Sequence, residues 1–179
     1  YKPNISLTAD QNIILCDIDP KDREKITQIL LKYNIKIREQ ITDLHRYFLA
    51  CVAMPTCGKA LAEAERVTVP LIADFENLMA KHNIKQDKIS VRITGCPNGC
   101  ARPYVGDIGI VGRTPDNYAL YIGGDFEGTR LNTKVFDRVP YENMMEVFDI
   151  LFAKYVAERK NASELFGDFV HRVGANVCA

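Results

Sequence analysis

The sequence has no excess of either charge, because 23 lysine and arginine residues balance 23 aspartate and glutamate residues. A chain without net charge creates no long-range field that attracts nucleic acid or an anionic membrane, so any anion-binding site must be local. No apolar run approaches the roughly 20 residues that span a bilayer. No charged segment followed by an apolar one opens the chain, as it would in a secretory signal. We therefore expect no nucleic-acid partner and no membrane partner.

The chain also has no internal repeat, no low-complexity tract and no long linker. It opens with Tyr-Lys-Pro and has no initiating methionine, which suggests a processed or partial sequence. Its 179 residues suit one domain or two small ones that share a core. An apolar fraction of 47% is enough to form that core.

Hydrophobic spacing predicts helices and strands that interleave along the chain. The predicted helices span about 20–33, 59–67, 70–82 and 140–160, with a short last helix around 165–169. The predicted strands span about 12–17, 89–94, 107–111 and 118–122. The helix over 59–67 rests on a high alanine content. Helices and strands that interleave in this way indicate an α/β or α+β class, and we expect α+β with a mixed α/β order of elements.

Four of the six cysteines lie in two short loops. Five residues separate Cys51 from Cys57, three separate Cys96 from Cys100, and 38 residues, 58–95, separate the two pairs. Proline and glycine in both loops favour turns that point thiolates and backbone N–H groups toward a common centre. An iron–sulfur cluster needs both kinds of group, because thiolates hold the iron and N–H donors to sulfur tune its potential.

Three other interpretations fit cysteines of this kind. They can be free buried thiols, which behave as small apolar groups. They can bind zinc, although structural zinc sites favour pairs spaced by two to four residues. They can form disulfides within the loops, which a reducing compartment disfavours. The pattern favours a four-thiolate metal centre of the iron–sulfur kind, but the spacing alone does not identify a reaction. Cys16 and Cys178 are not assigned to metal.

Several segments resemble the sirohaem-dependent sulfite and nitrite reductase family. Residues 94–103, Thr-Gly-Cys-Pro-Asn-Gly-Cys-Ala-Arg-Pro, resemble the signature loop of that family. The resemblance covers about residues 6–174, and its other parts are the first cysteine loop, Ala62–Arg66, Leu7–Asn12, Gly167–Phe169, Arg172 and Gly174.

The resemblance implies a fold, two cofactors and a ligand set. It implies part of a second ferredoxin-like repeat over 1–40, and a domain over 41–179 that binds a 4Fe-4S cluster and sirohaem. Cys51, Cys57, Cys96 and Cys100 would be the cluster ligands. Cys100 would also be the catalytic residue, since in the family the last cysteine of the second loop bridges the cluster and the sirohaem iron.

Four further residues would bind the sirohaem: Gln11, Asn12, Asn98 and Arg102. The implied reaction is the six-electron reduction of sulfite to sulfide in sulfate assimilation and cysteine biosynthesis. Glycine at position 99 favours sulfite, because the nitrite-reducing enzymes tend to have serine there. The alternatives are a nitrite reductase and a non-catalytic iron–sulfur electron-transfer module.

The family also implies partners. Electrons would come from ferredoxin or from an NADPH-dependent flavoprotein. Basic residues that bind sulfite would lie in the N-terminal half of the same enzyme, outside this chain, so we expect the 179 residues alone to have little activity. The expected location is the cytoplasm or the plastid stroma.

Overall fold

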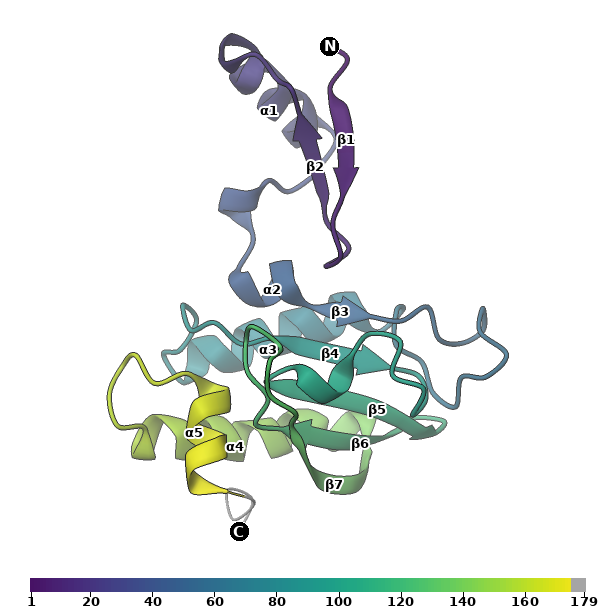
Figure 1. Cartoon of the computed structure of the whole chain (residues 1–179), viewed down its shortest axis with the longest axis vertical. Coiled ribbons are helices and arrows are strands. Elements are labelled where there is room, and N and C mark those ends of the chain that lie inside the picture. Colours follow the sequence, from purple (N-terminus) through teal and green to yellow (C-terminus); the bar gives the residue numbers. More distant parts are fainter. Residues whose placement is uncertain (175–179) are drawn as a thin grey trace.

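A five-stranded sheet is the centre of the computed structural model, which describes residues 1–174 (Figure 1). The strand order is β3-β4-β5-β6-β7; β3, β4 and β5 run parallel, and β5, β6 and β7 run antiparallel. The strands span Leu49–Ala50 (β3), Val91–Thr94 (β4), Ile108–Thr114 (β5), Asn117–Ile122 (β6) and Thr133–Pro140 (β7).

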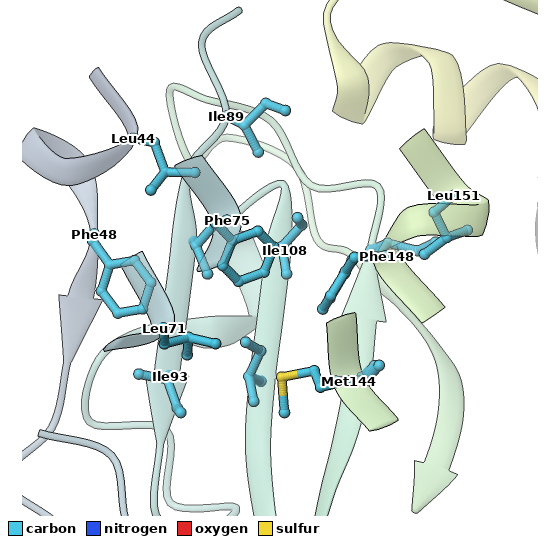
Figure 2. Close-up of a cluster of buried hydrophobic side chains, with 14 of the residues drawn as sticks. Leu44, Phe48, Leu71, Phe75, Ile89, Ile93, Ile108, Met144, Phe148 and Leu151 are labelled. Atoms are coloured by element: carbon cyan, nitrogen blue, oxygen red, sulfur yellow. The ribbon is translucent and has the colours of Figure 1, made fainter. Parts of the chain in front are cut away.

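Two helices, α3 (Thr68–Lys81) and α4 (Met144–Glu158), cover one face of this sheet (Figure 1). In α3 the residues Leu71, Phe75 and Met79 repeat every four positions, so they share one helix face, and all three are buried. The rings of Phe75 and Phe148 pack 4.9 Å apart between the helices and the sheet (Figure 2). This core fixes the strands whose ends carry the cysteine loops.

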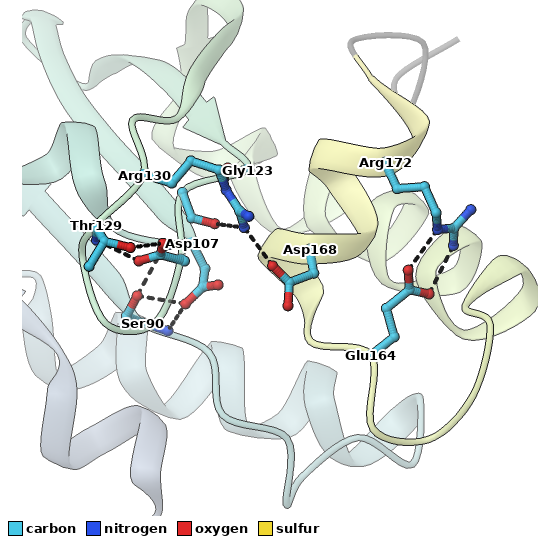
Figure 3. Close-up of polar contacts among 10 residues, drawn as sticks. Ser90, Asp107, Gly123, Thr129, Arg130, Glu164, Asp168 and Arg172 are labelled. Atoms are coloured by element: carbon cyan, nitrogen blue, oxygen red, sulfur yellow. Dashed lines mark hydrogen bonds and ion pairs between the residues drawn. The ribbon is translucent and has the colours of Figure 1, made fainter.

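Short elements and polar contacts complete this part of the molecule (Figure 3). Buried Asp107 accepts hydrogen bonds from the backbone N–H and the hydroxyl of Ser90, at 2.8 and 2.6 Å. Arg172 of α5 forms a two-pronged ion pair with Glu164, at 2.6 and 2.8 Å. These elements are η3 (Pro103–Val105), η4 (Tyr141–Asn143) and α5 (Phe166–Val173).

The N-terminal part stands away from the sheet (Figure 1). It contains the antiparallel pair β1 (Asn4–Leu7) and β2 (Ile13–Cys16), then η1 (Pro20–Asp22) and α1 (Arg23–Lys32). None of the residues in these elements is buried. The chain then reaches the sheet through η2 (Arg38–Gln40) and α2 (Asp43–Tyr47).

The helix predicted over 59–67 is wrong, because the structure has turns and bends there. The alanines of this segment serve close packing instead: Ala62 and Ala64 are fully buried. The backbone N–H groups of Leu61 and Ala62 both donate to the carbonyl of Gly95, at 2.8 and 3.0 Å. A tertiary contact has overridden the intrinsic helix propensity of alanine.

The other predicted elements are confirmed, with boundaries that shift by a few residues. The α+β class is also confirmed. Three strands, β1, β3 and β7, and the short helix α2 were not predicted. Cys178 lies outside the described residues.

Candidate metal centre

Both cysteine loops leave the same edge of the sheet. Cys51 follows β3 directly, and Cys96 lies two residues beyond the end of β4. Because β3 and β4 are parallel neighbours, their carboxyl ends meet at one edge. The N–H of Cys51 donates to the carbonyl of Ile93 at 3.1 Å, which continues the ladder up to the first cysteine.

The two loops are in direct contact. The backbone N–H of Gly95 donates to the sulfur of Cys51 at 3.2 Å. A Cβ atom at position 95 would lie 2.6 Å from the carbonyl oxygen of Ala62 and 2.8 Å from the Cβ of Ala53. Only glycine therefore allows the second loop to approach the first this closely.

The first loop is held by its own backbone and by one arginine. The N–H of Cys57 donates to the carbonyl of Ala53 at 2.7 Å, which closes the loop. The guanidinium of Arg66 donates to the carbonyl of Met54 at 2.5 Å and pairs with Glu63. Arg66 thus ties the tip of the loop to the segment that follows it.

The second loop rests on a tyrosine. The hydroxyl of Tyr104 donates to the carbonyl of Pro97 at 2.9 Å. Gly99 has a φ of +73°, and a Cβ there would lie 2.9 Å from the Tyr104 ring. Partial burial raises the pKa of Tyr104, so its hydroxyl stays a donor at neutral pH. The side-chain amide of Asn98 donates to the sulfur of Cys100 at 3.4 Å.

The four thiols suit an iron–sulfur cluster in their chemistry and exposure. Cys51, Cys57 and Cys96 are half-buried, whereas Cys100 is exposed. Two of the four sulfurs already accept an N–H hydrogen bond, the contact that tunes such clusters. Among residues 1–174, no three His, Cys, Asp or Glu side chains converge closely enough to hold a single metal ion.

Three of the predicted sirohaem contacts are engaged in other bonds. The side chain of Gln11 bonds to the backbone of Ala50, and that of Asn12 donates to the carbonyl of Arg46 at 2.9 Å. The guanidinium of Arg102 pairs with Asp10 at 3.4 Å.

A family model described as "Nitrite and sulphite reductase 4Fe-4S domain" matches residues 42–178, well over half of the chain. The chain belongs to this nitrite and sulphite reductase 4Fe-4S domain family. The match begins just before α2 and contains both cysteine loops.

Curated relatives within this nitrite and sulphite reductase group align with almost the whole chain. The "Sulfite reductase (NADPH) hemoprotein beta-component" of Nitrobacter hamburgensis is 41% identical over 174 residues, which is 97% of this chain and 30% of that protein. The protein of the same name from Leptospira biflexa is 42% identical over 168 residues, which is 93% of this chain and 30% of that protein. The chain thus spans about 30% of the length of these relatives.

A solved structure has the same fold as this chain. The structure of the Mycobacterium tuberculosis NirA protein superposes with a TM-score of 0.83 and 22% identity, covering 98% of this chain and 34% of that one. Within residues 1–174, no helix combines the length and the apolar character needed to cross a bilayer.

The sequence analysis did not identify two residues that hold the cysteine loops in place, Arg66 and Tyr104. Arg66 was noticed only as part of a motif, and Tyr104 was given no role at the site. A usable signal was present for Tyr104: a glycine in a tight turn, followed shortly by an aromatic residue, allows the ring to lie against the missing side chain. For Arg66 no local signal exists, because its partner is the carbonyl of Met54, 12 residues earlier.

Proposed function

We propose that this chain is the cluster- and sirohaem-binding part of an assimilatory sulfite reductase. One observation carries the proposal: the Gly95 N–H contact with the Cys51 sulfur joins two loops that lie 44 positions apart in the sequence. The two relatives described above, both named sulfite reductases, support sulfite as the substrate.

In this proposal Cys51, Cys57, Cys96 and Cys100 would hold a 4Fe-4S cluster, and the exposed Cys100 would be the ligand shared with the sirohaem. When bound, the two cofactors supply the iron that takes sulfite and the path for single electrons. The overall reaction consumes one sulfite, six electrons and six protons, and yields one sulfide and three waters.

The chain's own residues would orient the bridging sulfur. The Asn98 amide and the Gly99 turn on Tyr104 keep Cys100 at the surface in a fixed direction. A hydrogen bond to a thiolate stabilises its negative charge, so the Asn98 amide would favour the ionised sulfur. Asn98→Ala would therefore shift the cluster potential while leaving the iron content intact.

The basic groups that neutralise sulfite would lie outside this chain. Arg102, the cation closest in sequence to Cys100, is engaged by Asp10 and by the carbonyl of Ala9. A complete anion site therefore needs the N-terminal half of the enzyme. Sulfite reduction by the 179-residue chain alone, at a rate near that of the longer protein, would contradict this division.

The experiment replaces single cysteines by serine in a longer form of the protein, one that has the full length of the curated relatives. Iron, acid-labile sulfide and extractable sirohaem are quantified for Cys51→Ser, Cys96→Ser and Cys100→Ser. We expect Cys51→Ser and Cys96→Ser to lose most of the cluster, and Cys100→Ser to lose the magnetic coupling between cluster and sirohaem. Cys16→Ser is the matched control, because Cys16 lies at the end of β2, in the N-terminal part that stands away from the sheet.

A cofactor content in the Cys51, Cys96 and Cys100 variants equal to that of Cys16→Ser would contradict the ligand set. A cluster without extractable sirohaem in the unaltered protein would instead support a non-catalytic electron-transfer module. Nitrite reduced faster than sulfite would favour the nitrite-reducing branch.

We further propose that the electrons come from NADPH through a flavoprotein component. The names of both relatives specify NADPH and a beta-component, which implies a companion component in those enzymes. The test compares sulfite reduction with NADPH plus the flavoprotein against reduction with reduced ferredoxin. Faster turnover with ferredoxin would overturn this choice of donor.

We also propose a domain division into 1–40, a partial ferredoxin-like repeat, and 41–179, the cofactor-binding domain. The hairpin of β1 and β2 has no buried residue, so this part has no core of its own and needs cover from elsewhere. Limited proteolysis of the 179-residue chain should cut first near residues 35–41. Initial cleavage within the sheet would contradict the division.

A further inference from the structure

We propose that the turn Thr8–Asn12, between β1 and β2, is a positioning clamp for both cysteine loops. This inference rests on the proposed function, because it assigns the turn a role in seating the cluster. In Figure 1 the turn lies next to α2 and β3, at the base of the N-terminal hairpin.

The first arm of the clamp is Gln11. Its amide Nε2 donates to the carbonyl of Ala50 at 2.9 Å, and its Oε1 accepts from the N–H of Ala50 at 3.3 Å. This two-way bond copies the pairing of a neighbouring strand on β3, an edge strand of only two residues. Because Ala50 immediately precedes Cys51, the bond fixes where the first cysteine begins.

The second arm is Arg102, two residues after Cys100. Its guanidinium donates to the carbonyl of Ala9 at 3.2 Å and pairs with Asp10 at 3.4 Å. The N–H of Arg102 also donates to the carbonyl of Gly99 at 2.8 Å. The same turn thus holds the chain where it enters the first loop and where it leaves the second.

The turn is stiff enough to act as one body. The N–H of Thr8 donates to the carbonyl of Asn12 at 2.9 Å, and the N–H of Asn12 donates to the Thr8 hydroxyl at 3.0 Å. The Asn12 amide anchors the turn to the carbonyl of Arg46 at 2.9 Å. A shift of the turn would therefore move Cys51 and Cys100 together.

Gln11 is the arm to test, because it bonds the backbone next to Cys51 and is not one of the four proposed cluster ligands. Gln11→Ala removes both bonds to Ala50. Asn4→Ala is the matched control, since Asn4 lies in the same hairpin and its amide bonds to Asp17, away from the loops. Both variants are made in the protein of the relatives' length.

The first readout needs no cofactor. Amide hydrogen exchange of the peptide spanning residues 49–57 is compared in the protein prepared without iron or sirohaem. Loss of two hydrogen bonds predicts exchange about tenfold faster in Gln11→Ala, and no change in Asn4→Ala. The second readout is the reduction potential of the loaded cluster, which should shift only in Gln11→Ala.

A third variant, Gln11→Glu, separates positioning from general stability. A protonated glutamic acid matches glutamine, because it can donate to the Ala50 carbonyl and accept from the Ala50 N–H. The ionised form can only accept. In Gln11→Glu, the amide exchange rate of residues 49–57 should equal that of the unaltered protein at acidic pH. At neutral pH this rate should rise toward that of Gln11→Ala. The charged groups that interact at this turn include Asp10, Arg92 and Arg102, and all three are unchanged in the three variants.

If the amides of residues 49–57 exchange equally fast in Gln11→Ala and Asn4→Ala, the positioning role of the turn is wrong. The same follows if exchange in Gln11→Glu, relative to the unaltered protein, does not change with pH. If the unaltered protein binds no cluster, the proposed function fails, and the exchange experiment still decides whether Gln11 holds the loop. If Gln11→Ala does not fold, the pH dependence of Gln11→Glu gives the same decision.

Discussion

At the scale of single residues, Asp107 is a carboxyl group whose pKa depends strongly on burial. Burial raises its pKa from 3.8 to about 6, although hydrogen bonds from the Ser90 side chain and backbone oppose the shift. The folded state therefore binds a proton that the unfolded state releases between pH 4 and 6. Stability should fall as pH rises through this window, by up to about 3 kcal/mol, and level off above it.

The prediction is that Asp107→Asn removes this slope. Asparagine keeps an oxygen for the Ser90 donors but does not ionise. The measurement is the free energy of unfolding in urea from pH 4 to 7, for variant and unaltered protein. Asp137→Asn is the control, because the pKa of exposed Asp137 is lowered by Lys134 and acts below this window. Parallel curves for Asp107→Asn and the unaltered protein would refute the prediction.

Residue types at the site were predictable, but their bonds were not. Four cysteines in two turn-forming loops predict a thiolate metal centre, and this ligand set stays a prediction. Gln11 was singled out as a sirohaem contact, yet its amide bonds to Ala50, 39 positions later. A sequence shows that an amide can donate, but only the folded chain shows which carbonyl lies opposite.

At the scale of elements, the position of the second cysteine loop depends on its close contact with β5. A Cβ at Gly112 would meet the backbone of Gly95 and lie 2.8 Å from the Cβ of Ala62. Backbone atoms cannot move aside cheaply, so Gly112→Ala should push the loop away from Cys51. We expect a loss of about 1–3 kcal/mol in stability and a clear loss of iron per chain.

Gly58→Ala is the matched control for this substitution. A Cβ at Gly58 meets nothing within 4 Å, so its variant should keep its iron and change stability by less than about 0.5 kcal/mol. Urea unfolding and iron quantification are made on both proteins. Full iron content in Gly112→Ala would show that the loop tolerates displacement.

Elements with a regular hydrophobic period were predictable from the sequence. Elements whose conformation depends on tertiary contacts were not. The four-residue spacing of α3 predicts its helix well. In β7, register shifts opposite Leu120 leave both Val135 and Phe136 half-buried, which breaks the alternation that identifies a strand. Residues 59–67 show the opposite failure, since alanine favours a helix that the contact with Gly95 prevents.

At the scale of the whole molecule, the hairpin of β1 and β2 presents one apolar face. Ile5 pairs with Leu15 and Leu7 with Ile13, so all four side chains lie on the same side. Leu7 is 77% exposed and Ile13 is 65% exposed. An exposed strip of this kind is typical of a contact surface. The chain spans about 30% of its relatives' length, and in our domain proposal the remainder covers this face.

This proposal predicts a substitution whose effect depends on chain length. Leu7→Lys should cost the protein of the relatives' length more than about 2 kcal/mol, because a buried leucine contributes that much and a lysine cannot replace it. In the 179-residue chain the same change should be nearly neutral, because Leu7 is exposed there. Ser6→Lys is the control, since Ser6 pairs with Ile14 on the opposite face. Urea unfolding of both variants and of the unaltered protein, each at both lengths, gives the comparison. An equal cost for Leu7→Lys at both lengths would mean that the rest of the protein does not cover the hairpin.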